Sequence, residues 1–320
     1  MDRGRHRIDT HHHILPPDYL AAHRDDIAEV AAEFAPQVLG WTAAKSLDAM
    51  DAAGVATSIT SISAPGLWFG NVEETRTLAR GCNEFASRLA TEHPARFAAF
   101  AALPLPDVDA SLREIDFAIG LPGVRGFGLM TSYGNRWPGD PVFAPVFDEL
   151  DRRRAVVYFH PRSCACCSGM ATDVPPAIME YPFDTTRAIT SLLYSGTFTR
   201  CPNIRFLFSH AGGVFPMLAH RIARYAGVRE DLRQRMPDGA MAELRKLHFD
   251  LVSATNPIAY EAARSLVGES RLLFGSDYPY WSPRMAADGL AALNLDSDVT
   301  RAIERGNAMA LFAGALETVP

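Results

Sequence analysis

Short apolar segments alternate with longer amphipathic segments along almost the whole chain. Eight apolar segments fit buried strands, and they cover residues 8–13, 55–61, 97–103, 124–130, 155–160, 204–210, 248–253 and 271–277. Most are nearly continuous in apolar residues, as strands covered on both faces must be. Helical patterns lie between them, at residues 72–92, 108–118, 141–154, 185–198, 215–228 and 257–267.

Strict alternation of eight strands with helices predicts a closed parallel barrel, the (β/α)₈ or TIM-barrel fold, built from one domain over residues 1–320. Two connections are longer than the rest, residues 16–40 after the first strand and 161–181 after the fifth. The first has room for extra helix. Long loops after barrel strands usually belong to the active-site face, so we expect both connections there.

Charge and composition exclude some partners. The net charge is -6 and basic residues are spread along the chain, so nothing favours a nucleic acid or an anionic membrane as partner. No apolar run approaches the roughly 18 residues that span a bilayer, and the N-terminus lacks the apolar centre of a signal peptide. We therefore expect a cytoplasmic protein. The five cysteines, an odd number, predict reduced thiols.

Metal-binding residue types stand at the ends of the predicted strands. Five such residues are His11, His13, His160, His210 and Asp277. Side chains alternate along a strand, so His11 and His13 point to one face and His12 to the other. The C-terminal ends of barrel strands meet at one mouth, where these five groups converge. Nitrogen and oxygen donors favour Zn²⁺, and Mn²⁺, Fe²⁺ and Co²⁺ are compatible.

Several longer segments form a distinctive series along the chain. They are IDTHHHILPP, GLMTSYG, VVYFHP, EYPFDTTRAITSLLYSG, FLFSHAGGVFPMLAHRI and LLFGSDYPY. In this order they resemble the amidohydrolase superfamily over nearly the whole chain. Within it, they are similar to the decarboxylase branch that contains the aminocarboxymuconate semialdehyde, γ-resorcylate and 6-methylsalicylate decarboxylases. DTTRAI followed by SHAGG is most similar to the last of these.

The resemblance implies a role for each of the five residues. Metal ligands would be His11, His13, His160 and Asp277, with His210 beside the metal as a catalytic acid or base. Many binuclear relatives bridge two metals with a lysine on the fourth strand. Here neither Lys45 nor Lys246 lies at a strand end, so we expect one divalent metal, with Zn²⁺ favoured and Mn²⁺ compatible. The resemblance also implies a homodimer or homotetramer.

Taken together, these features favour a carboxy-lyase, a nonoxidative decarboxylase that releases CO₂ from a small aromatic hydroxy acid such as 6-methylsalicylate. The ring carbon that loses CO₂ must gain a proton, and both His210 and Asp277 are candidates to deliver it. The alternative is a hydrolase of a lactone, ester or amide that uses metal-bound water. A noncatalytic metal-binding protein is disfavoured because no residue of the metal shell is missing.

Arginines and aromatic residues are candidates for substrate binding. Arg221 follows His210 by eleven residues, and the resemblance matches it to an arginine that reaches a substrate carboxylate across a dimer interface. A solvated helix arginine is the alternative. Arg187 either binds substrate or braces the barrel rim. Trp68 and Phe69 either wall the pocket or pack in the core.

Other residues near the predicted mouth have less specific roles. Tyr278, Tyr280 and Trp281 follow Asp277 and are candidate pocket walls; Asp250 either orients a catalytic group or forms an interior hydrogen bond. A second cysteine pair that would complete a tetrahedral site with Cys164, Cys166 and Cys167 is missing, so we interpret these three as part of an active-site loop. We expect His6, His23, His93 and His220 on solvated faces.

Overall fold

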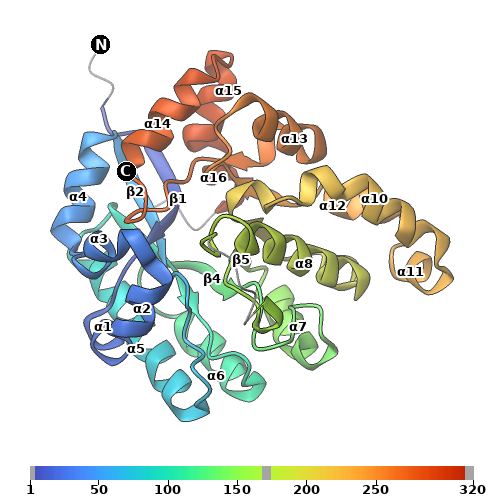
Figure 1. The fold of residues 1–320 in the computed structure, drawn as a ribbon, viewed down its shortest axis with the longest axis horizontal. Helices are drawn as coiled ribbons and strands as arrows, with labels where there is room; N and C mark the ends of the chain where they lie inside the picture. The colour runs from blue at the N-terminus through green and yellow to red at the C-terminus, as the bar shows by residue number, and fades with distance from the viewer. Residues whose placement is uncertain (1–3, 168–173, 314–320) are drawn as a thin grey trace.

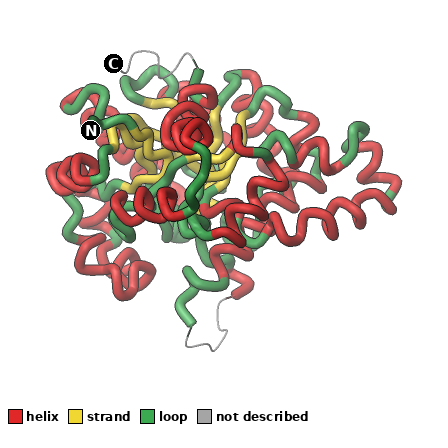
Figure 2. The backbone as a smooth tube through the Cα atoms, turned by 90° about the horizontal axis from the view of Figure 1, so that it is seen from above, coloured by secondary structure: helices red, strands yellow, loops and turns green. Residues whose placement is uncertain are grey.

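A computed structural model describes residues 4–167 and 174–313. Its eight strands form one parallel sheet in the order β1 to β8, surrounded by helices (Figures 1 and 2). The strands are β1 (Arg7–His13), β2 (Val55–Ser61), β3 (Phe97–Ala102), β4 (Val124–Met130), β5 (Val156–His160), β6 (Arg205–Phe208), β7 (His248–Asp250) and β8 (Leu272–Leu273). The predicted (β/α)₈ barrel is confirmed.

The barrel closes where β1 meets the residues that follow β8. Thr10 donates its backbone N–H to the carbonyl oxygen of Phe274 at 3.0 Å, and Asp277 donates its backbone N–H to the carbonyl oxygen of His11 at 2.8 Å. These hydrogen bonds hold the segment that follows β8 against β1. They also place the side chain of Asp277 beside the end of β1.

The last three strands are shorter than the sequence pattern predicts. β6, β7 and β8 end two, three and four residues before the predicted ends. Beyond them the backbone is no longer extended, because His210, Ser253 and Asp277 adopt φ angles of 53°, 56° and 62°. The prediction failed there because a buried apolar run does not reveal where the backbone turns.

Apolar side chains fill the barrel below its mouth. Ile8, Phe100 and Tyr158 belong to a buried interior cluster that is separate from the larger core between the sheet and the helices. Phe312, just after the last helix, belongs to the same interior cluster, and its ring centre lies 5.7 Å from that of Phe100. Below its mouth the barrel is therefore a packed core and not an open channel.

The helices cover the outside of the sheet. They are α1 (Pro17–Ala22), α2 (Arg24–Ala31), α3 (Ala35–Leu39), α4 (Ala43–Ala52), α5 (Val72–Glu92), α6 (Val108–Ala118), α7 (Ala144–Arg152), α8 (Glu180–Tyr194), α9 (Thr197–Arg200), α10 (Phe215–Val228), α11 (Glu230–Arg235), α12 (Ala240–Leu244), α13 (Pro257–Val267), α14 (Pro283–Ala292), α15 (Ser297–Arg301) and α16 (Asn307–Leu311). The predicted extra helix after the first strand is confirmed as α1 to α3. Within the described residues, no helix has both the length and the apolar character that crossing a bilayer requires.

Candidate metal centre and active site

Four buried side chains converge at the C-terminal mouth of the barrel. They are His11 and His13 from β1, His160 from β5 and Asp277 from the segment after β8, and their donor atoms all lie within 4.8 Å of one another. The Nε2 atoms of His11 and His13 are 3.0 Å apart, and Asp277 Oδ1 lies 3.2 and 3.0 Å from them. Three imidazoles and one carboxylate at this spacing form a donor set for one divalent cation.

The contacts and the protonation state of His160 indicate whether a metal ion fits this donor set. Both of its ring nitrogens are buried, and neither has a hydrogen-bond partner within the described parts of the chain. An unpaired buried polar atom costs on the order of 1–3 kcal/mol, so a cation bound by one nitrogen would offset part of that cost. Burial and then the charges of His13 and His11 hold the pKa of His160 well below its ordinary value. The ring is therefore neutral, which is the form that binds a metal.

Asp250, the last residue of β7, holds His11 from behind. Its Oδ2 lies 3.0 Å from His11 Nδ1, and its Oδ1 accepts the backbone N–H of His210 at 3.0 Å and of Val252 at 3.1 Å. Burial lowers the pKa of His11, but the carboxylates of Asp250 and Asp277 outweigh it and raise the pKa to about 10. Once a metal ion has displaced the proton from Nε2, a carboxylate behind the imidazole keeps the remaining ring proton on Nδ1. Of the two roles that the sequence left open for Asp250, this contact favours the orienting one.

His210 stands beside Asp277 at the same mouth. Its Nε2 lies 3.3 Å from Asp277 Oδ2, the oxygen that does not face His11 and His13. Both residues adopt the left-handed backbone conformation, which is uncommon outside glycine and clusters at functional sites. Gly213 has a φ of 67°, and a Cβ there would lie 2.2 Å from the carbonyl oxygen of Pro182. Only glycine fits where the SHAGG segment meets α8.

His12 points away from the metal centre, as the strand pattern predicts. Its Nδ1 lies 3.1 Å from Asp9 Oδ2, and its Nε2 lies 3.1 Å from the hydroxyl of Ser46 on α4. Asp9 also accepts a 2.6 Å hydrogen bond from the hydroxyl of Ser276. These contacts tie the first strand to the segment that carries Asp277.

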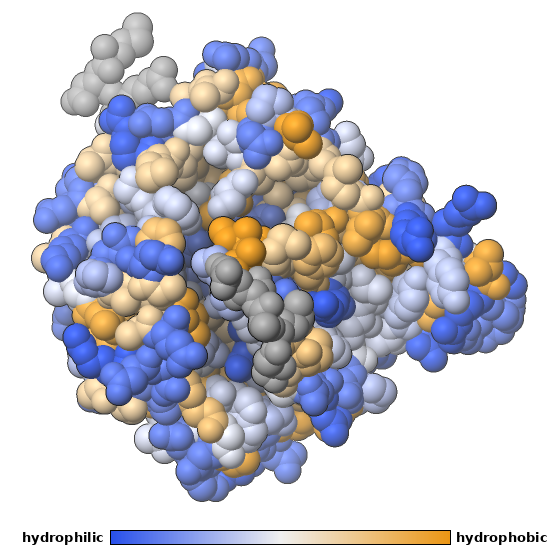
Figure 3. Space-filling view, in the orientation of Figure 1, coloured by the Kyte–Doolittle hydropathy of each residue, from blue (hydrophilic) through white to orange (hydrophobic). Residues whose placement is uncertain are grey.

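A cavity of about 830 Å³ opens above these groups, and His160, His210 and Asp277 lie among its lining residues. Tyr181, Tyr280, Trp281 and Phe34 line it as aromatic walls. Met217 and Ile258 also line it and are 72% and 80% exposed. Figure 3 shows apolar side chains gathered between the centre of this face and α10. The volume lies within the range of ligand pockets, and the aromatic walls suit a planar ring.

The three residues predicted to bind substrate do not line this cavity. Trp68 is half-buried and packs against the main core. Arg187, on α8, has its Nη1 4.0 Å from Asp184 Oδ1, and Arg221 is exposed on α10. Their roles in substrate binding stay predictions.

Two other predicted aromatic residues also lie away from the cavity. Tyr278 stacks on His12, with ring centres 4.8 Å apart, and Phe69 stacks on His23. His23 is only 8% exposed, so the expected solvated position is wrong for this residue. Its Nδ1 lies 3.0 Å from Asp26 Oδ2, and its Nε2 lies 3.3 Å from Glu74 Oε1. The ring is buried because the preceding helix brings it against Phe69.

Two cysteines of the loop after β5 differ from the prediction. Cys164 and Cys166 form a disulfide, with Cα atoms 5.4 Å apart, while Cys82, Cys167 and Cys201 are free. The expectation of five reduced thiols is wrong for this pair. Two residues so close in sequence come within bonding reach only when the loop turns back, and the sequence does not show that turn.

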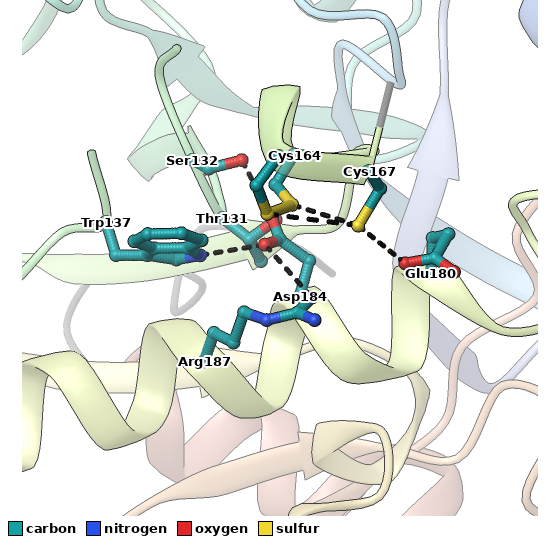
Figure 4. The surroundings of a disulfide bond; sticks show 9 residues. Thr131, Ser132, Trp137, Cys164, Cys167, Glu180, Asp184 and Arg187 are labelled. Carbon is teal, nitrogen blue, oxygen red and sulfur yellow. Dashed lines mark hydrogen bonds and ion pairs between the residues drawn. A yellow bond between two sulfur atoms is a disulfide. The ribbon is translucent and has the colours of Figure 1, made fainter. Parts of the chain in front are cut away.

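Asp184 was not singled out from the sequence, yet it joins two of the segments that carry the resemblance. It is buried and accepts hydrogen bonds from Thr131 Oγ1 at 2.6 Å, Ser132 Oγ at 2.8 Å and Trp137 Nε1 at 2.8 Å (Figure 4). These contacts hold the loop after β4 against α8. The signal in the sequence that could have identified Asp184 was its position as the first residue of the DTTRAI segment.

Comparisons with known proteins agree with this geometry. Residues 8–314 match the family model described as amidohydrolase. The decarboxylase yanB of Aspergillus niger is 34% identical over 86% of this chain and 77% of its own length, and the 6-methylsalicylic acid decarboxylase of Penicillium expansum is 31% identical over 96% of each. A crystal structure named amidohydrolase II superposes with a TM-score of 0.86 and 28% identity, covering 96% of this chain and 99% of the other. The chain therefore belongs to the amidohydrolase family.

Proposed function

We propose that this protein is a metal-dependent, nonoxidative decarboxylase of a small aromatic hydroxy acid such as 6-methylsalicylate. The observation that carries the proposal is that His210 lies beside Asp277, which is the carboxylate of a three-imidazole, one-carboxylate donor set in an aromatic-walled cavity. Relatives that share about a third of the sequence are named as decarboxylases, one of them of 6-methylsalicylic acid.

The metal proposed for this site is one divalent ion held by His11, His13, His160 and Asp277. Zn²⁺ suits a donor set of three imidazoles and one carboxylate, and Mn²⁺ is the second candidate. When bound, such an ion supplies a Lewis acid that holds the substrate's carboxylate and its neighbouring phenolic oxygen. Elemental analysis of the protein purified without a reductant should find one ion per chain.

Proton delivery is assigned to the His210–Asp277 pair, with His210 as the group that carries the proton. Breaking the bond between the ring and the carboxylate releases CO₂ and leaves an electron pair on the ring carbon, which then takes a proton. Asp277 turns Oδ1 to the ligand imidazoles and Oδ2 to His210 Nε2. A carboxylate that binds a metal ion must be deprotonated, so Asp277 keeps no proton to give.

Two substitutions separate these roles. His210→Asn should retain the metal and lose turnover, because the ligand set is untouched. Asp277→Asn should lose turnover together with much of the metal affinity. A His210→Asn enzyme with near-normal turnover would contradict the assignment of proton delivery to His210.

Apart from the proposed metal ion, the described residues that line the cavity include no arginine or lysine, and we propose that Arg221 of a second copy adds a positive charge for the substrate's carboxylate. Met217, Arg221 and Tyr225 are spaced by four residues on α10, so they share one helix face, and the two apolar members are 72% and 61% exposed. A homodimer that covers this face would also narrow the open rim of the cavity. Light scattering should report a dimer, and Arg221→Ala should raise KM more than it lowers kcat.

A cytoplasmic location stays a prediction.

The deciding experiment measures CO₂ release from 6-methylsalicylate and from dihydroxybenzoates, alongside turnover of lactones and esters. We expect CO₂ release from at least one aryl acid and an equal amount of the decarboxylated phenol. Lactone turnover without CO₂ from any aryl acid would contradict the decarboxylase and favour the hydrolase.

A further inference from the structure

Three cysteine sulfurs and one carboxylate meet on the loop between β5 and α8. Cys164 and Cys166 are joined as a disulfide, and Cys167 Sγ lies 3.2 Å from Cys164 Sγ and 3.9 Å from Cys166 Sγ. On the other side, Cys167 Sγ lies 2.8 Å from Oε2 of Glu180, the first residue of α8 (Figure 4). The three sulfur atoms all lie within 4.8 Å of one another.

Glu180 changes what the sequence alone indicated about these cysteines. A tetrahedral site needs four donors, and no second cysteine pair is present to complete one with these three. The fold brings Glu180 to Cys167 from thirteen residues away. Three thiolates and one carboxylate make a complete donor set for a thiophilic divalent cation.

The spacing of these donors is close to what a tetrahedral cation requires. With metal–sulfur bonds of about 2.3 Å and a metal–oxygen bond of about 2.1 Å, sulfurs stand about 3.8 Å apart and sulfur stands about 3.6 Å from oxygen. The separations of Cys167 from its three neighbours, 3.2, 3.9 and 2.8 Å, need changes of less than about 1 Å. Only the sulfur atoms of Cys164 and Cys166 must move apart by more than this, and they can do so once their disulfide is reduced.

Access and charge also suit a cation at this place. Cys166 is exposed and Cys167 half-buried, so an ion can enter from solvent, whereas Cys164 is buried and anchors the loop. Arg187, on the same helix as Glu180, is close enough for its positive charge to act on the Cys167 thiol. Its Nη1 is buried without a hydrogen-bond partner among the described residues. The guanidinium of Arg187 would balance part of the net negative charge of a site in which three thiolates and one carboxylate bind a divalent ion.

We propose that Cys164, Cys166, Cys167 and Glu180 form a second cation site, specific for thiophilic divalent ions such as Zn²⁺ and separate from the metal centre at the barrel mouth. The site exists in the reduced protein. Two molecules of a low-molecular-weight thiol become one disulfide, and Cys164 and Cys166 each gain one electron and one proton. The cation then displaces the thiol protons to solvent. Bound there, it joins the loop that follows His160 to the start of α8, where Tyr181 lines the active-site cavity.

Cobalt binding to the full-length protein tests this site, because thiolate-to-Co²⁺ charge transfer absorbs in the near ultraviolet and the imidazole–carboxylate centre has no thiolate. Metal-free protein is first reduced with a phosphine and then titrated with Co²⁺. We expect two Co²⁺ per chain, with the charge-transfer band accompanying one of them. One Co²⁺ per chain without the band would overturn the proposal.

Variants and oxidation locate the donors. Cys166→Ser and Cys167→Ser should each abolish or strongly weaken the band, whereas Cys82→Ala, which removes a buried thiol on α5, should leave it intact. Glu180→Gln should weaken Co²⁺ binding at this site at least about tenfold. Oxidation of the wild-type protein with diamide should remove the band without any substitution. A band that survives in the Cys166→Ser/Cys167→Ser double variant or in the oxidised protein refutes the site, and an unchanged Co²⁺ affinity in Glu180→Gln refutes the fourth donor.

Discussion

Replacing Asp250 with asparagine should weaken metal binding at the barrel mouth without removing a ligand. The carboxylate lies 3.0 Å from His11 Nδ1 and also accepts the backbone N–H groups of His210 and Val252. In Asp250→Asn, the amide oxygen can keep both backbone hydrogen bonds, which turns the NH₂ group toward His11 Nδ1. That nitrogen must then accept a hydrogen bond, so the ring proton moves to Nε2, the atom that faces the metal position.

The size of the effect follows from the contact that is lost. Partners behind metal-ligating histidines typically contribute 10- to 100-fold to metal affinity, which is about 1.4–2.7 kcal/mol. We expect a loss in this range, measured by competition with a chelator of known affinity. Turnover should fall even at saturating metal, because Asp250 also holds the backbone of His210.

Asp9→Asn is the matched control for this substitution. Asp9 is equally buried and lies on β1, but the imidazole that it contacts is that of His12, which points away from the metal. In Asp9→Asn the amide oxygen can keep the hydrogen bonds from the backbone N–H groups of His11 and Ser276, so the variant should lose folding stability and keep most of its metal affinity. An Asp250→Asn variant that binds the metal as tightly as the wild type would refute the proposed role of Asp250.

Three further outcomes are expected. Dialysis against a chelator should abolish turnover and added Zn²⁺ or Mn²⁺ should restore it; full activity in protein shown to be metal-free would contradict the proposed chemistry. Phe312→Ala empties the closed end of the barrel and should cost about 3–5 kcal/mol of unfolding free energy in a urea titration while leaving metal affinity unchanged. Burial, and then the charge of Arg271, lowers the pKa of His248 to about 4. In the unfolded chain His248 takes up a proton below about pH 6.5, whereas in the folded chain it does so only near pH 4. The free energy of unfolding should therefore fall by up to about 3 kcal/mol as the pH decreases from about 6.5 to about 4. His248→Gln should flatten that part of the profile, and an unchanged slope would show that another group causes it.

The sequence by itself determined the architecture and the four groups that form the candidate metal donor set. Buried parallel strands are covered on both faces, so they appear as nearly continuous apolar runs whose order can be counted. Alternation along a strand placed His11 and His13 on one face and His12 on the other, and the structure confirms this arrangement. The convergence of strand ends in a barrel then brought His160 and Asp277 to the same mouth without knowledge of any loop.

Only the tertiary structure decided which groups stand behind and around those donors. Asp250 reaches His11 because the barrel closes, and Glu180 reaches Cys167 because the loop after β5 turns back onto α8. The dependence on tertiary structure also explains why the expectations of a solvated His23 and of reduced Cys164 and Cys166 were wrong. Such contacts join residues whose separation along the chain carries no periodic signal. They depend on loop conformation and helix packing, which local patterns of apolar and polar residues do not specify.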